Sequence, residues 1–140
     1  MRGIAGMLLG AFALIAVSHA ALADTARFTG QLGPDDPVPG AQPSTAKGTA
    51  TLSLDTGSKT VTWVIDYSGL SQAAAGVECG MLDSPNGPSI NVTSNLASPV
   101  KGSKTLTDAE MSGLTAGHWV CLVGTSDDEA EIGGELRRAP

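Results

Sequence analysis

The amino-acid sequence predicts an all-β domain, a Greek-key β-sandwich or flattened barrel of about seven or eight short antiparallel strands with one short helix. Three observations lead to this fold class. Apolar and polar residues alternate in several short segments, which is the period of a half-buried strand. Segments rich in Gly, Pro, Asn and Asp separate these runs, as turns do. One segment alone combines the start and stop signals of a helix.

The first 24 residues, "MRGIAGMLLGAFALIAVSHAALAD", have the composition of a secretory signal peptide. One positive charge precedes an apolar run, and an A-x-A pattern ends at Ala23. This predicts a signal peptide over residues 1–23 with cleavage before Asp24; cleavage after Ala20 is the alternative. An uncleaved membrane anchor is a further alternative, but the apolar run is short for a span of ~20 residues. We therefore expect one domain over residues 24–140, periplasmic or secreted, with no stable membrane span after cleavage.

The charge balance restricts the class of partner. The chain has 8 basic and 14 acidic residues and a formal net charge of −6, and loss of Arg2 with the signal peptide makes the mature chain more negative. Affinity for nucleic acid depends on Lys and Arg that meet phosphates, so the balance argues against nucleic acid. It argues equally against an anionic membrane surface. We expect an acidic exported domain that is a monomer.

The strongest local prediction is a β-hairpin over residues 49–67. "TATLSLD" and "TVTWVIDY" both alternate with period two, and the Gly-containing turn "DTGSK" lies between them. The remaining strand candidates are shorter: "ARFTGQL" near the start, "VECGML" and "SINVTSNL" around a turn-rich segment, "HWVCLVG", and a final "EAEIGGEL" weakened by its glycines. "HWVCLVG" is apolar on both faces, which is typical of a strand covered on both sides.

A helix is predicted near residues 108–114, in "LTDAEMSGLTAG". Thr107 and Glu110 have the spacing of a capping box, and Leu106 and Met111 have that of a hydrophobic staple. Gly117 marks the expected end of the helix.

With these elements placed, the sequence resembles the CHRD domain, a family named from chordin and common in exported bacterial proteins. "LTDAEMSGLTAGHWVCLVGTSDDEAEIGGEL" resembles its closing segment, and "FTGQLGPDDPVP", "GTATLSLD" and "VTWVIDYSGLS" resemble its early pattern in the same order. The resemblance covers nearly all of residues 27–136. It implies a β-sandwich that is not an enzyme and that binds a protein or cell-envelope component.

The chain departs from the family pattern at its histidines. The family commonly carries A-H-I-H-G where this chain has "GVECG", so Val77 and Cys79 stand at the two histidine positions. In the family's Y-V-N-V-H-T, Cys121 stands for the asparagine and Val123 for the histidine. Gly133 replaces the arginine of the last motif. A metal role carried over from the family is therefore in doubt.

The chain's only two cysteines, Cys79 and Cys121, are predicted to form a disulfide that stabilises the domain. Cysteines of an exported protein are usually paired. Each cysteine shares strand parity with apolar neighbours, and the resemblance brings the two strands together where the family's histidines meet. Two free buried thiols are one alternative. A metal site with Glu78 and His118 is another, but those two residues point to the opposite strand face.

We predict no catalytic residues, cofactor or metal, because no nucleophile, zinc-protease or phosphate-loop motif is present. The acidic residues of "TSDDEAE" are consecutive, unlike calcium ligands, and indicate a solvated turn. The sequence leaves two hypotheses of function: a non-catalytic exported binding domain, or a small periplasmic redox or metal-handling protein that uses Cys79 and Cys121.

Overall fold

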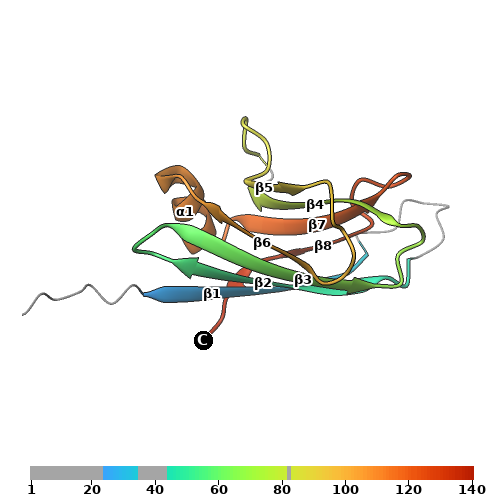
Figure 1. Ribbon diagram of the computed structural model, residues 1–140, viewed down its shortest axis with the longest axis horizontal. Helices are drawn as coiled ribbons and strands as arrows, with labels where there is room; N and C mark the ends of the chain where they lie inside the picture. Colours follow the sequence, from blue (N-terminus) through green and yellow to red (C-terminus); the bar gives the residue numbers. More distant parts are fainter. Residues whose placement is uncertain (1–23, 35–43, 82) are drawn as a thin grey trace, which may run out of the picture.

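Residues 24–34, 44–81 and 83–140 are described by a computed structural model, in which two antiparallel sheets pack face to face (Figure 1). The first sheet has the strand order β6-β3-β2-β1-β9 and the second has the order β5-β4-β7-β8. The elements are β1 (Thr25–Leu32), β2 (Lys47–Asp55), β3 (Thr60–Ser68), β4 (Ala74–Met81), β5 (Ile90–Val92), β6 (Val100–Thr105), α1 (Asp108–Thr115), β7 (Trp119–Thr125), β8 (Ile132–Glu135) and β9 (Arg137–Arg138). The predicted all-β sandwich with one short helix is confirmed. The signal peptide predicted for residues 1–23 lies outside the described residues.

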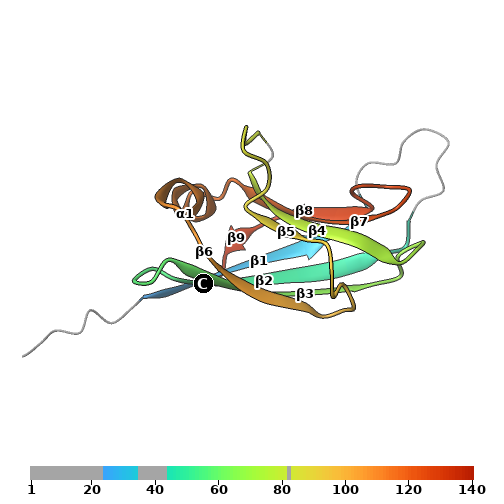
Figure 2. The same cartoon turned by 45° about the horizontal axis from the view of Figure 1, so that its top comes forward.

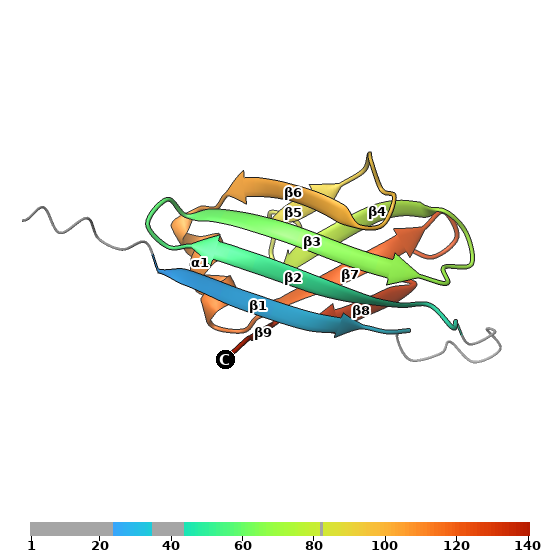
Figure 3. The ribbon, with the colours of Figure 1, turned by 60° about the horizontal axis from the view of Figure 1, so that its bottom comes forward.

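The chain alternates between the two sheets. It crosses to the second sheet after β3, returns after β5, crosses again through α1, and reaches the first sheet for the last time at β9. Gly33 and Gly133 exchange two backbone hydrogen bonds of 3.0 and 2.8 Å, which join the β1 side of one sheet to the β8 side of the other. Figure 3 shows the broad face of the first sheet with β6, β3, β2 and β1 side by side.

The predicted hairpin is β2 and β3, and their register runs from Lys47↔Ser68 to Asp55↔Thr60. The carboxylate of Asp55 closes the turn because its Oδ1 accepts hydrogen bonds from the backbone N–H groups of Gly57 (2.9 Å) and Ser58 (3.1 Å). The alternate residues of both strands point into the core, as their period of two requires.

Two strands of the first sheet were not predicted from the sequence, β6 and β9. β6 reads VKGSKT, so Val100 is its one buried aliphatic residue. At the next inward position Gly102 leaves room for an indole: a Cβ there would lie 2.7 Å from Cε2 of Trp63 on β3. A glycine in place of an apolar side chain removes the alternation, and lysines are common on exposed edge strands. β9 has only two residues, too few for a periodic signal.

The helix α1 covers one end of the sandwich (Figure 2). Its predicted capping box is present: Glu110 N–H donates to the Thr107 hydroxyl (3.2 Å), and Thr107 N–H donates to Glu110 Oε1 (3.0 Å). At its other end Gly117 has φ +81°, and the N–H groups of Gly117 and His118 donate to carbonyls of the last turn, as in a Schellman motif.

The acidic segment after β7 corrects one prediction. Glu131 is not part of a solvated turn; it is only 6% exposed. Its Oε1 accepts hydrogen bonds from the Ser44 hydroxyl (3.1 Å) and from Ser71 N–H (2.9 Å). Through these hydrogen bonds the carboxylate, which precedes β8, links the segment before β2 to the segment after β3. Asp127 and Asp128 are exposed, as expected.

Candidate binding surface

Four of the positions at which the sequence departs from the CHRD pattern lie together on the inner face of the second sheet, whereas the fifth, Gly133, pairs with the outward-pointing Leu122. Val77 pairs with Val123 and Cys79 pairs with Cys121 across β4 and β7. All four side chains are at most 1% exposed. A disulfide joins Cys79 to Cys121, whose Cα atoms are 4.1 Å apart. At the positions where the CHRD pattern described above has three histidines and an asparagine, this chain therefore has a covalent link between two strands and a pair of valines, both inside the core.

The four residues weighed for a metal site do not converge. The two sulfurs are bonded to each other, so neither is a thiolate that could bind a metal. Glu78 is exposed on the outer face of β4, and His118 is exposed where β7 begins. Across the ranges that the structure describes, no group of three His, Cys, Asp or Glu side chains could hold a metal ion.

Two loops fold back over the outer face of the second sheet and leave a trough between them. A Cβ on Gly80 of β4 would lie 2.7 Å from the backbone nitrogen of Ser89, so loop 83–89 passes directly over this position. A Cβ on Gly124 of β7 would lie 2.7 Å from the carbonyl carbon of Glu129, so loop 126–130 passes over the opposite end. In Figures 1 and 2 loop 83–89 stands above the sheet near α1.

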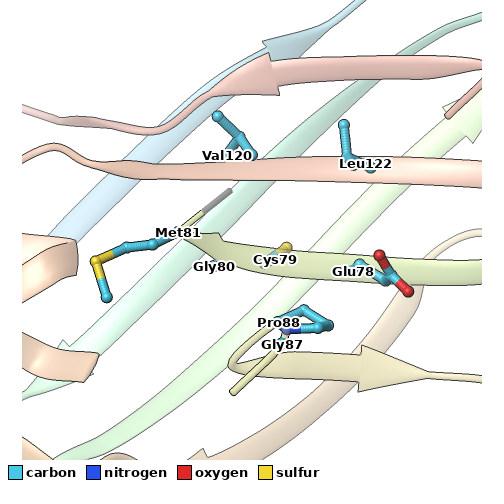
Figure 4. A pocket seen from close by; sticks show the side chains of 8 residues that line it. All are labelled: Glu78, Cys79, Gly80, Met81, Gly87, Pro88, Val120 and Leu122. Carbon is cyan, nitrogen blue, oxygen red and sulfur yellow. The ribbon is translucent and has the colours of Figure 1, made fainter. Parts of the chain in front are cut away.

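The outer trough, as we call this hollow, has an aliphatic floor. Val120 and Leu122 of β7 are half-buried and project outward, two residues apart on one strand. They pair with Gly80 and Glu78 on one side and with Glu135 and Gly133 on the other. Figure 4 shows the residues that line the central hollow of about 100 Å³: Glu78, Cys79, Gly80, Met81, Gly87, Pro88, Val120 and Leu122.

A second hollow continues the trough toward α1. Its volume is about 630 Å³, and it shares Met81 and Val120 with the first. Asp83, His118 and Glu135 line its polar side. At the opposite end a third hollow of about 290 Å³ shares Glu78 and reaches Glu129. The trough therefore runs along β4 and β7, aliphatic at its centre and acidic on its rim.

The sequence interpretation of β7 as a strand covered on both sides is wrong. The inner face is buried against the first sheet, but Val120 and Leu122 on the outer face remain half-buried. A two-layer sandwich covers one face of each sheet. Apolar residues at both alternating sets of positions in β7 fit a strand covered on both faces. They fit equally a strand with one buried face and one partly exposed aliphatic face, and sequence alone does not distinguish these two structures.

Charge is distributed unequally between the two layers. Arg2 lies outside the described residues, and every other Lys and Arg lies on the first sheet or in the turn between β2 and β3. The second sheet, its loops and α1 carry none of them but hold most of the described acidic residues. The outer trough therefore lies on the negative side of the molecule.

Lys104 of β6 holds the end of loop 83–89, which forms one side of the outer trough. Its Nζ donates to the carbonyl oxygen of Ser89 (2.6 Å) and lies 3.5 Å from Glu110 Oε2. Burial of Glu110 by itself raises the pKa of its carboxyl, but hydrogen bonds from Thr107 and Ser89 and the charge of Lys104 outweigh it. The pKa of Glu110 consequently lies below its ordinary value of 4.5.

Among the residues that the structure describes, no helix has the length and apolar character that a membrane span requires.

Comparison with protein families matches the model of the CHRD domain to residues 28–137. Comparisons with curated proteins and with solved structures give no match. The matched segment runs from the middle of β1 to the start of β9 and so includes both sheets, the disulfide and the outer trough. The chain belongs to the CHRD domain family.

Proposed function

We propose that this chain is an exported, non-catalytic binding domain that recognises a protein or cell-envelope component through its outer trough. The family supports a non-enzymatic domain. CHRD domains are extracellular, and a disulfide is consistent with an oxidising compartment, which supports a periplasmic or secreted location. The negative charge supports a partner other than nucleic acid.

The observation that carries the proposal is the half-buried, outward-pointing aliphatic pair Val120 and Leu122 at the centre of a sheet face. Aliphatic side chains on the solvent face of an antiparallel sheet are usually replaced by polar ones, as they are on β1 and β2 of the first sheet. An apolar patch with a polar rim is typical of an interaction site. Gly133, which pairs with Leu122 on β8, carries no side chain that could cover Leu122 on that side.

The alternative, a redox function of Cys79 and Cys121, has no supporting geometry. Thiol–disulfide exchange requires a thiolate to reach one of the sulfurs. The two cysteines are 1% and 0% exposed and lie between the two sheets. We therefore assign the disulfide a stabilising role.

Affinity capture from the native exported fraction tests the proposal. The baits are the wild-type domain, a Val120→Thr/Leu122→Thr variant, and a Val64→Thr variant. Val64 is a suitable control because it is half-buried and points outward from β3 on the other sheet. Circular dichroism checks that all three baits are folded.

We expect the wild type and the Val64 variant to retain the same captured component and the Val120/Leu122 variant to lose it. Equal capture by all three folded baits would place the binding surface elsewhere.

A further inference from the structure

We infer that the outer trough binds an extended protein segment in which lysine or arginine side chains alternate with aliphatic ones. This inference rests on the proposed function and specifies the chemistry of the partner. It follows from the charge of the rim, the spacing of the floor residues, and the position of the chain's own cations.

Carboxylates lie at the middle and at both ends of the trough, with His118 beside those at the end near α1. Glu78 lies at the middle, Glu129 at one end, and Asp83 and Glu135 at the end near α1. Glu135 is paired with Arg137 at 3.0 Å. The ion pairs found within the described ranges include none of the other three carboxylates. The rim therefore offers anionic groups whose cationic counterparts a partner would supply.

The floor sets the spacing of the partner's side chains. Val120 and Leu122 are two residues apart on β7, so their side chains emerge about 6.8 Å apart on one face. An extended segment repeats its own side chains on one face at the same spacing. Aliphatic residues at alternate positions can therefore contact Val120 and Leu122 in turn. The intervening cationic side chains leave from the opposite face, and their long flexible stems let the charged ends bend toward the rim carboxylates on either side.

The positions of the chain's own cations make the charge of the trough selective. Within the described residues, Arg137 of β9 is the one Lys or Arg that pairs with a rim carboxylate, Glu135; the ion pairs found there include none of Glu78, Asp83 and Glu129. A cationic segment is attracted to this layer, and an anionic segment is repelled. Glu78 is the most informative single residue because it pairs directly with Leu122 at the centre of the trough.

Binding of synthetic peptides to the full domain tests the inference. The probe is the blocked peptide Gly-Lys-Val-Lys-Leu-Lys-Val-Lys-Gly with a fluorescent label. One comparison peptide replaces every lysine with glutamate, and another has the same composition with its lysines grouped at one end. Fluorescence polarisation measures the dissociation constants at two salt concentrations.

The protein variants are Glu78→Lys and a matched control, Asp66→Lys. Both residues are exposed on central strands, on opposite faces of the sandwich, and both substitutions change the net charge equally. We expect the alternating peptide to bind the wild type, the glutamate peptide not to bind, and the grouped peptide to bind less tightly. Glu78→Lys should weaken binding about tenfold or more, and Asp66→Lys by about twofold or less.

Four outcomes would overturn the inference. Equal weakening by the two variants would mean that net charge alone attracts the peptide. Equal affinity for the grouped and alternating peptides would mean that binding does not require an extended segment with alternating side chains. Absence of peptide binding, while native capture still depends on Val120 and Leu122, would refute this inference and leave the proposed function in place. Self-association of the wild type in sedimentation velocity that Glu78→Lys abolishes would identify a second copy of the chain as the occupant.

Discussion

Replacing Cys79 and Cys121 together with alanine should lower the free energy of unfolding by about 4 kcal/mol. The two residues are 42 positions apart in the sequence, so the bond closes a long loop in the unfolded chain. On the chain-entropy model a loop of this length corresponds to roughly 13 cal/mol/K, or about 4 kcal/mol at 25 °C. A domain of this size should then melt about 15 °C lower.

Urea denaturation followed by tryptophan fluorescence separates this effect from a loss of packing. Without the cross-link the unfolded chain expands and exposes more surface, so the slope of unfolding free energy against urea should increase. The matched control is Val77→Ala/Val123→Ala, the adjacent buried pair on the same two strands. That variant loses packing but keeps the link, so its stability should fall while the slope stays at the wild-type value.

Two results would contradict the stabilising role. One is a loss below about 1 kcal/mol with an unchanged slope, which would mean that the bond does not constrain the unfolded state. The other is loss of partner capture by a variant whose stability is unchanged, which would mean that the cysteines themselves form the site. Because both sulfurs face the core, we expect the folded double variant to keep its binding at the outer trough.

Three further changes test other contacts. Gly102→Ala should destabilise the domain by about 1–3 kcal/mol in urea denaturation, because the new Cβ would overlap the indole of Trp63; wild-type stability would show that this indole can move at little cost. Glu131→Gln should cost about 2 kcal/mol by the same measurement, because a carboxylate that accepts part-buried hydrogen bonds from Ser44 and Ser71 is lost. A loss below about 0.5 kcal/mol would contradict the stabilising role of these hydrogen bonds. The pKa of Glu110 is lowered in the folded state, so the unfolded state binds more protons and stability falls as pH drops below about 4.5. Glu110→Gln should reduce this acid dependence in thermal melts at about pH 3 to 7. An unchanged dependence would contradict the contact with Lys104.

Much of the fold could be predicted because its signals are local. The hairpin of β2 and β3 follows from alternation and a turn composition that ten or so residues contain. The helix follows from the spacing of Thr107 and Glu110, whose hydrogen bonds close within one turn. β6 could not be predicted, because Gly102 takes its place in the core by accommodating Trp63 from a distant strand.

The candidate site could also be predicted only in part. Strand parity in the sequence already indicated that Cys79 and Cys121 face an apolar side, because parity is a property of each strand alone. Whether they meet depends on the register of β4 against β7, which loops, α1 and the opposite sheet determine. Which segments pack together also decides that Val120 and Leu122 stay partly exposed, that Glu131 is buried, and that several carboxylates line one trough. Sequence thus determined the inward and outward faces of the strands whose residues alternate, and the tertiary structure alone decided which outward faces other segments leave uncovered.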